Sequence, residues 1–191
     1  MRLRQYCLAL AACAAFGACA AELDQSPVVL VAKPQLGEFY RNTVLFARPV
    51  GGGRHLGFIV NRPTPVKLAA LFPGHPPSQK VTDPVFLGGP LHVDSVFAVV
   101  NRSEHPGGRS IPLAKDMFLV MDAGTVDRVI EQNRNDARFY VGLVLWQPGE
   151  LESELQRGFW YVMDHDARLV FRQTTDGLWE ELVRRSSRTV M

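Results

Sequence analysis

The sequence predicts a single α+β domain in which helices flank a mixed, mainly antiparallel sheet. Two observations support this class. Short apolar runs of strand length follow one another along the chain, and a few helical patterns lie between them without the regular alternation of a parallel sheet. A chain of 191 residues, 47% of them hydrophobic, can bury one extensive core. We find no repeat and no low-complexity linker, so we expect one domain from residue 21 to residue 191.

The predicted sheet begins with three apolar runs, at residues 28–32 (VVLVA), 43–47 (TVLFA) and 56–60 (LGFIV). Each has the length and composition of a buried strand. Residues 49–54, between the last two runs, include three glycines, which permit the positive φ values of a hairpin loop. A phosphate-binding loop is the alternative. We favour the hairpin because no Lys-Ser/Thr pair and no helix follow the glycines.

Strands and helices follow one another irregularly through the rest of the chain. Asp122 can cap a helix that presents Val126, Val129 and Ile130 on one face. Residues 148–150 (PGE) open a later helix whose acidic residues lie near the positive end of its dipole. The expected elements are a helix at 66–72, a Pro-rich loop at 73–83, strands at 85–87, 95–100 and 117–121, a helix from 122 to about 133, a strand at 138–146, a helix from 150, a strand at 159–163 and a terminal helix at 175–185.

The first twenty residues have the pattern of a secretory signal peptide. Arg2 and Arg4 give a positively charged start, residues 6–16 are uncharged and largely apolar, and small residues follow. The alternatives are a buried N-terminal helix and a misassigned start codon. No other apolar run approaches the roughly 18 residues of a membrane-spanning helix, so we expect no such helix. We expect export, with a signal peptide at residues 1–20.

Two processing routes remain open at the end of this segment. An Ala-x-Ala pattern at residues 18–20 predicts a cut that leaves Ala21 as the new terminus and releases the protein into the periplasm or the medium. Residues 16–19 (FGAC) resemble a lipobox, which would lipidate Cys19 and anchor the protein to the membrane. We favour soluble release because phenylalanine is atypical at the first lipobox position.

Cysteine usage and charge exclude several functions for the mature domain. All three cysteines (Cys7, Cys13 and Cys19) precede residue 21, which removes disulfides, thiolate catalysis and cysteine-ligated metals from that domain. The full chain has 21 basic and 19 acidic residues, and loss of Arg2 and Arg4 leaves 19 of each sign. We expect no nucleic-acid binding, because that function usually requires a net basic surface.

Several segments together resemble the YqgE/AlgH family of bacterial proteins. Their order and spacing over residues 28–183 carry the resemblance more than any one of them does. The segments are LVAKP at 30–34, FYRNTV at 39–44, GFIVNRPT at 57–64, FLGGPL at 86–91 and GLVLWQPGELESEL at 142–155.

The resemblance implies one domain with a curled sheet and flanking helices, and it implies no agreed biochemical activity. One member's name associates it with transcriptional regulation of alginate synthesis. The chain departs from the family pattern at residues 48–50 (RPV), where the family often has Cys-Glu-His, so any activity that rests on that Glu or His is not expected here. Glu150 replaces the family's glutamine. Most members lack a signal peptide and are cytoplasmic.

Two predicted bends contain the candidate ligand-binding residues. Asn61 and Arg62 follow a strand, and Arg62 can bind an anion by a two-pronged contact, with a purely structural turn as the alternative. Gly88 and Gly89 place backbone N–H groups in a tight bend that can form an anion nest or an oxyanion hole. Glycines needed only for the bend explain it as well. If a site exists, we expect it where these two bends meet, which requires them to be neighbours in space.

Other chemistry is sparse. None of the five histidines has the spacing of metal ligands, and the familiar serine hydrolase motifs are absent, so we expect no metal and no cofactor. His92 follows the second bend and Asp94 follows it closely, so a site there is conceivable, with surface residues as the alternative. Trp146 can line a pocket, although a core tryptophan is the simpler interpretation.

These observations favour a non-catalytic binding or regulatory module of the cell envelope, with an unidentified small ligand or envelope protein as its partner. The alternative is a small hydrolase-like enzyme in which Arg62 and the amides of Gly88 and Gly89 stabilise an anion and His92 or Asp94 acts as the base. A transcriptional regulator, the third hypothesis, comes from the family name only and fits poorly with export and a balanced charge.

Overall fold

A computed structural model describes residues 26–132 and 134–188 of the chain. The predicted signal peptide at 1–20, Cys19 as a lipidation site and Ala21 as a mature terminus lie outside the described residues. Among the residues that the structure does describe, no helix is long and apolar enough to cross a membrane.

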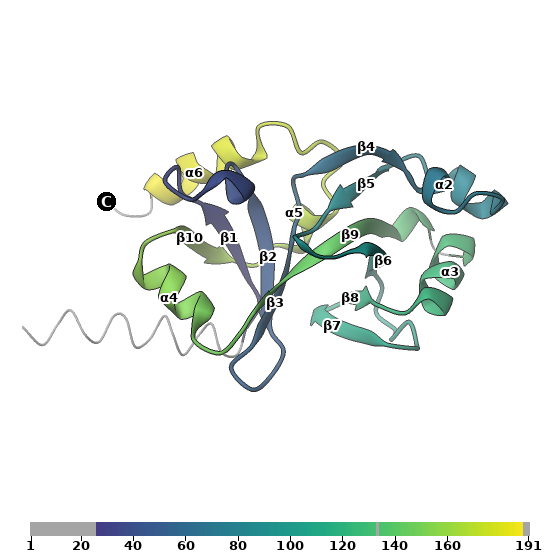
Figure 1. The fold of residues 1–191 in the computed structure, drawn as a ribbon, viewed down its shortest axis with the longest axis horizontal. Helices are drawn as coiled ribbons and strands as arrows, with labels where there is room; N and C mark the ends of the chain where they lie inside the picture. Colours follow the sequence, from purple (N-terminus) through teal and green to yellow (C-terminus); the bar gives the residue numbers. More distant parts are fainter. Residues whose placement is uncertain (1–25, 133, 189–191) are drawn as a thin grey trace, which may run out of the picture.

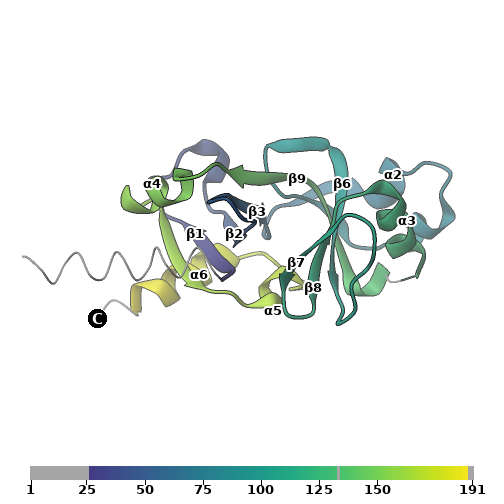
Figure 2. The ribbon, with the colours of Figure 1, turned by 90° about the horizontal axis from the view of Figure 1, so that it is seen from below.

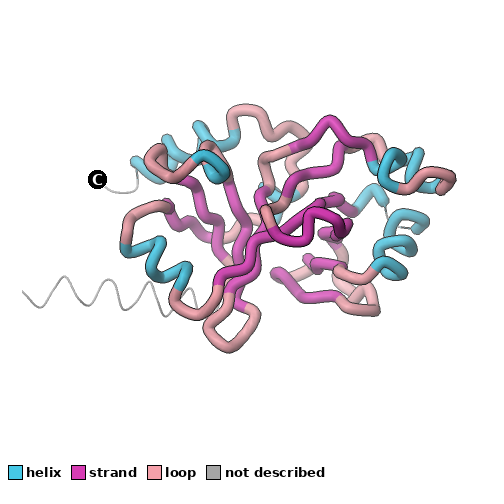
Figure 3. The backbone as a smooth tube through the Cα atoms, viewed as in Figure 1, coloured by secondary structure: helices cyan, strands magenta, loops and turns pink. Residues whose placement is uncertain are grey.

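One strongly curved sheet forms the centre of the molecule, and helices lie around it (Figures 1 and 3). The strand order along its main path is β10-β1-β2-β3-β9-β6-β8-β7. Strand β5 pairs with β9 in parallel, and β4 pairs with β5. All other pairs are antiparallel. The strands are β1 Val28–Ala32, β2 Val44–Pro49, β3 His55–Ile59, β4 Pro63–Lys67, β5 Pro84–Leu87, β6 Leu91–Asn101, β7 Ser110–Ala114, β8 Met117–Val120, β9 Ala137–Trp146 and β10 Trp160–Asp164.

The helices are short and lie at the periphery. Asp122 caps α3 as the sequence predicts, because its Oδ1 accepts a hydrogen bond from Thr125 N at 3.0 Å. The helical segments are η1 Glu38–Tyr40, α2 Leu68–Leu71, η2 Pro76–Lys80, α3 Ala123–Gln132, η3 Arg134–Asp136, α4 Glu150–Gln156, α5 Ala167–Val170 and α6 Leu178–Arg188, where η marks a 3₁₀ helix.

Strand β9 joins the two halves of the sheet. Its C-terminal residues pair with β3, and its N-terminal residues pair with β6 and β5. In Figure 2 it runs between the half that contains β1 and β2 and the half that contains β6 and β8. Gly142, with φ of +73°, lies near the change of partner, where a residue with a side chain would be strained.

The first strands are buried because both faces of their part of the sheet are covered. In β1, Val29 and Val31 pack in a core with Leu178 and Leu182 of α6. The alternate residues of β1 pack in a second core with Leu151 of α4. A third core lies under α3, which contributes Val126, Val129 and Ile130 as the sequence predicts. Continuous apolar runs in β1, β2 and β3 are the expected result of two covered faces.

The structure confirms the α+β class, the hairpin at 49–54 and most predicted elements. The prediction for residues 66–72 is wrong in part, because α2 has only four residues and Pro63–Lys67 forms strand β4. The predicted loop at 73–83 contains η2, and β6 begins at Leu91 rather than at residue 95. Strand β7 was not predicted from the sequence.

Candidate functional site

The two predicted bends are neighbours in space. Leu87 N donates to Arg62 O at 2.9 Å, and Ile59 N donates to Gly88 O at 2.8 Å. The condition on which the predicted site depended is therefore met. Its side chains, however, are largely engaged in holding the fold together.

The Asn61 side chain fastens the turn before β2. Its Oδ1 accepts from Val44 N at 2.8 Å, and its Nδ2 donates to Asn42 O at 2.9 Å. Asn42 has φ of +56°, a conformation that asparagine tolerates better than most residues. Asn61 thus has a structural role in linking the end of β3 to this turn.

The Arg62 side chain points to η1. Its Nη2 donates to Phe39 O at 2.6 Å, and its guanidinium lies 5.0 Å from the centre of the Phe39 ring. Burial lowers the pKa of Arg62, while its interaction with Tyr40 opposes the shift. Arg62 remains charged, since an arginine is effectively always protonated.

The Gly88-Gly89 bend is a close backbone crossing. A Cβ atom at Gly88 would lie 2.4 Å from Gly142 O, and one at Gly89 would lie 2.3 Å from Leu143 O. Gly88 N already donates to Val141 O at 2.8 Å. This amide is therefore engaged in the sheet, and the close approach to β9 explains both glycines without a ligand.

His92 and Asp94 lie on the exposed end of β6. His92 has φ of +56°, and Asp94 Oδ1 accepts from Ser95 Oγ at 3.3 Å. Both residues fall between Leu91 and Val96, where the pairing of β6 with β9 shifts register. They lie on an irregular, open part of the strand.

Trp146 is a core residue with 3% of its surface exposed. Its Nε1 donates to Glu154 Oε2 at 3.1 Å, and Trp160 Nε1 donates to the same oxygen at 2.7 Å. Burial raises the pKa of Tyr40 to about 12, and Glu154 adds to that rise. The segment at 142–155 therefore places Trp146 and Glu154 in one hydrogen-bonded cluster between β9, β10 and α4.

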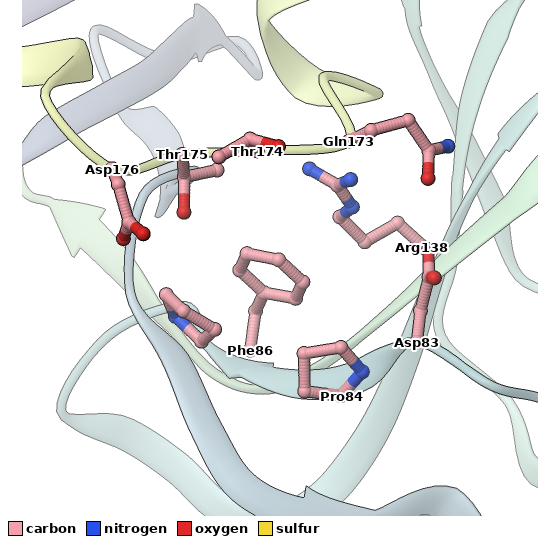
Figure 4. Close-up of a pocket in the computed structure, with 9 residues that line it drawn as sticks. Asp83, Pro84, Phe86, Arg138, Gln173, Thr174, Thr175 and Asp176 are labelled. Carbon is pink, nitrogen blue, oxygen red and sulfur yellow. The ribbon is translucent and has the colours of Figure 1, made fainter.

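The pocket with the most distinctive chemistry lies elsewhere, between β5, β9 and the segment before α6 (Figure 4). It encloses about 180 Å³. Proline and phenylalanine side chains form its apolar part, and hydroxyl, amide and carboxylate groups form its rim. Its lining residues are Pro63, Asp83, Pro84, Phe86, Arg138, Gln173, Thr174, Thr175 and Asp176.

Arg138 is the one cation that lines this pocket, and only 3% of its surface is exposed. Its Nη1 donates to Val170 O and its Nη2 to Arg172 O, both at 2.6 Å. The guanidinium lies 4.4 Å from the centre of the Phe86 ring. Figure 4 shows the two side chains next to each other in the pocket. Nε is buried and makes no hydrogen bond of ordinary geometry. Burial raises the pKa of Tyr140, and the charge and hydrogen bonding of the neighbouring Arg138 oppose that rise. Among the ion pairs of residues 26–132 and 134–188, none involves Arg138.

Sequence reasoning missed Arg138. The available signal was a charged residue at the start of an otherwise apolar run, RFYVGLVLW at 138–146. An arginine at a strand end normally points to solvent, and only the packing of α5 and the following segment over β9 buries this one. Of the predicted bend at 61–63, Pro63 alone lines the pocket.

Three further side chains gather at the α2–η2 end of the molecule. His75 Nε2 lies 3.3 Å from Asp127 Oδ1, and Glu131 lies beside them. One potential metal-ligand atom from each of the three residues lies within 4.8 Å of the others. The histidine and the two acidic residues are 52 and 56 positions apart, which is why spacing along the sequence gave no sign of the cluster.

Comparison with known proteins identifies the family. The sequence profile of the AlgH-like family matches residues 29–190. A UPF0301 protein of Streptomyces avermitilis is 32% identical over 166 residues, which cover 82% of this chain and 84% of the relative. A UPF0301 protein of Chlorobium limicola is 27% identical over 166 residues, or 85% of this chain and 87% of the relative.

Two solved structures share the fold. The solution structure of the AlgH protein from Pseudomonas aeruginosa superposes with a TM-score of 0.68 at 19% identity, over 86% of this chain and 88% of that one. The crystal structure of protein DIP2367 from Corynebacterium diphtheriae gives a TM-score of 0.67 at 22% identity, over 83% and 85%. Because the family profile matches residues 29–190, the chain belongs to the AlgH-like family.

Proposed function

We propose that this protein is a non-catalytic binding module of the cell envelope that holds a small organic anion in the Arg138 pocket. The observation that carries the proposal is a buried guanidinium at the pocket wall that forms no ion pair with an acidic side chain of the described residues. Buried charges in proteins are normally paired, because an unpaired one is costly. A carboxylate in the pocket would supply the missing partner.

The lining indicates the kind of anion. Phe86, Pro63 and Pro84 offer apolar surface beside the cation, so a ligand that joins a carboxylate to a ring or short hydrocarbon matches both parts. The volume of about 180 Å³ is below the range of roughly 300–1,000 Å³ that is usual for drug-sized ligands. A small molecule, or the end of a side chain from a partner, is the size that fits.

The acidic rim limits the total charge of the ligand. Asp83 and Asp176 both line the pocket, and Figure 4 shows them on opposite sides of Phe86. They repel a multiply charged anion, and they favour a ligand that carries one negative charge or that also carries an amine. This arrangement argues against inorganic phosphate as the natural ligand.

A binding role is better supported than the hydrolase-like alternative. Gly88 N is engaged with Val141 O, and the Arg62 guanidinium is engaged at η1. His92 and Asp94 are exposed on the irregular end of β6. The Gly88 amide and the Arg62 guanidinium are therefore occupied by the fold, and both candidate bases are open to solvent.

The envelope location rests on the sequence of residues 1–20 and on the balanced charge of the remainder. It is tested by fractionating cells and measuring the mass of the mature N-terminus. A chain that begins at Ala21, or at a lipidated Cys19, supports export. An intact Met1 in the cytosolic fraction would contradict it and would leave the pocket proposal untouched.

The pocket proposal is tested with a pair of ligands that differ in charge and share a shape. Benzoate and benzamide are titrated into ¹⁵N-labelled protein. Benzoate should shift the amide resonances of residues 173–176 in a saturable way, and benzamide should bind at least tenfold more weakly. Asp176→Asn should strengthen benzoate binding by removing local repulsion. Asp94→Asn removes the same charge from an exposed strand end and should change nothing, because salt screens over about 8 Å.

Two results would overturn the proposal. One is equal affinity for benzoate and benzamide, which would make Arg138 irrelevant to recognition. The other is an equal change in benzoate affinity in Asp176→Asn and Asp94→Asn, which would mean that net charge rather than the pocket governs binding.

A further inference from the structure

We propose that His75, Asp127 and Glu131 form a binding site for one divalent transition-metal ion, with Zn²⁺ as the best-matched example. The site lies where η2 meets α3, at the end of the molecule where Figure 1 shows α2 and α3. None of its three residues lines the Arg138 pocket. It is independent of the proposed function.

Helix α3 fixes the two carboxylates on one side. Asp127 and Glu131 are four residues apart, so they lie on the same face of the helix. Val126, Val129 and Ile130 of the same helix are held in the core. The helix backbone that carries the two carboxylates is therefore fixed by packing, while their exposed side chains can change rotamer.

His75 is positioned by its own backbone and by Phe72. Its N–H donates to Phe72 O at 3.2 Å, and its carbonyl accepts from Ser78 N at 3.1 Å and from Ser78 Oγ at 2.7 Å. Its ring lies 6.2 Å from the Phe72 ring, measured between centroids. These contacts direct the imidazole at α3 rather than into solvent.

The imidazole nitrogens are hidden from water and lack hydrogen-bond partners. This holds for both Nδ1 and Nε2, although Nε2 lies 3.3 Å from Asp127 Oδ1. The contact has the distance of an ion pair without the direction of a hydrogen bond. Hidden polar atoms without partners are uncommon, and each calls for an explanation. A metal ion between Nε2 and the carboxylate would provide one.

The distances suit a small ion. Bonds of about 2.0–2.2 Å from zinc to nitrogen and oxygen place tetrahedral donors roughly 3.4 Å apart. The His75–Asp127 pair already has a spacing of 3.3 Å. The widest separation in the set is within 4.8 Å, so the exposed Glu131 side chain needs to move by about 1–2 Å.

The donor set selects the class of metal. One imidazole nitrogen favours zinc and its neighbours over Mg²⁺ and Ca²⁺, which prefer oxygen alone. Two carboxylates balance the 2+ charge, and three protein ligands leave a fourth position for water. A bound ion would join the segment of α2 and η2 to α3.

The test titrates ZnCl₂ into metal-free full-length protein by isothermal calorimetry. Cys7, Cys13 and Cys19 are first blocked with iodoacetamide, so that thiolates do not compete. We expect one Zn²⁺ per chain, retained in excess Mg²⁺. His75→Ala and Glu131→Gln should each weaken binding about tenfold or more, since even outer-shell changes at metal sites cost that much. The matched control, His165→Ala, removes an exposed histidine elsewhere and should leave the affinity within twofold.

Circular dichroism of each variant shows whether it is folded, and Glu131→Gln keeps the test valid if His75→Ala is not. Weak binding that His75→Ala and His165→Ala reduce equally would mean an adventitious ion only and would overturn the proposal. Absence of a saturable heat at 100 µM Zn²⁺ in the wild-type protein, or binding unaffected by Glu131→Gln, would also overturn it.

Discussion

Replacement of Gly142 by alanine tests the idea that β9 and the Gly88-Gly89 bend cross too closely to allow any side chain between them. A Cβ atom at Gly142 would lie 2.1 Å from Gly89 O, and the residue has φ of +73°. The new methyl group therefore meets backbone rather than a side chain that can rotate away. The two segments would have to separate by about 1 Å to restore an ordinary contact.

The cost can be estimated from its parts. An L-residue in the left-handed region costs about 1 kcal/mol. Overpacking against a fixed neighbour costs about 1–3 kcal/mol. Separation of the segments would also weaken the hydrogen bonds from Gly88 N to Val141 O and from Ile59 N to Gly88 O, each worth about 1 kcal/mol. The expected total is about 4 kcal/mol, a large share of the roughly 5–15 kcal/mol that stabilises a typical domain.

Gly149→Ala is the matched control. Gly149 has a similar φ of +82°, and nothing lies within 4 Å of the position of its missing Cβ. Gly149→Ala should lower the free energy of unfolding only by the cost of placing an L-residue in the left-handed region, about 1 kcal/mol. The measurement is urea unfolding followed by tryptophan fluorescence, with the midpoint compared at constant m value. If Gly142→Ala costs no more than Gly149→Ala, the crossing tolerates a side chain and the argument from close approach is wrong.

Three further results are expected. Arg62→Ala should cost about 1 kcal/mol in urea unfolding, because it removes a charged hydrogen bond and a ring contact at a partly exposed site; a negligible cost would show that the contact with η1 is incidental. Glu154→Ala should cost about 2 kcal/mol, because two indole N–H groups lose their acceptor, and an unchanged midpoint would refute this. Burial opposes ionisation of Asp122, but hydrogen bonds from Arg109 and Thr125 outweigh it and hold its pKa below the ordinary value. The stability that this carboxylate contributes is therefore present above its unfolded-state pKa of about 4 and is lost as the pH falls through the folded-state pKa. Asp122→Ala should flatten the decline in stability below about pH 4, and an unflattened decline would count against this reasoning.

The strands that could be predicted from the sequence are those in which burial requires a continuous run of apolar residues. Strands β1, β2 and β3 are covered on both faces, so their residues are apolar without interruption. Strands β4 and β7 were missed because each contains proline, which is excluded from central strands. Each pairs with a strand on one side only, β4 with β5 and β7 with β8, and an edge of this kind tolerates proline.

Only the part of the candidate region that is formed by recognisable sequence motifs could be predicted. The meeting of the bends at Asn61–Arg62 and Gly88–Gly89 was anticipated from two motifs. The burial of Arg138 depends on the segment after α5, more than 30 residues later in the chain, and its two acceptors are backbone carbonyls that no residue type reveals. The cluster at His75 depends on how η2 packs against α3. Contacts of this kind between distant segments produce no recognisable pattern in the local sequence.

The position of β9 in the chain has a consequence for how the protein is made. Strands β1 to β3 and β6 to β8 are all synthesised before it, yet β3 and β6 both need it as a hydrogen-bonded partner. Until residue 146 has left the ribosome, each half of the sheet ends in an unpaired edge of apolar residues. Such edges attract other strands. A nascent chain stalled before β9 should therefore depend on chaperones, and the two halves of the finished protein should exchange their amide protons together rather than as separate units.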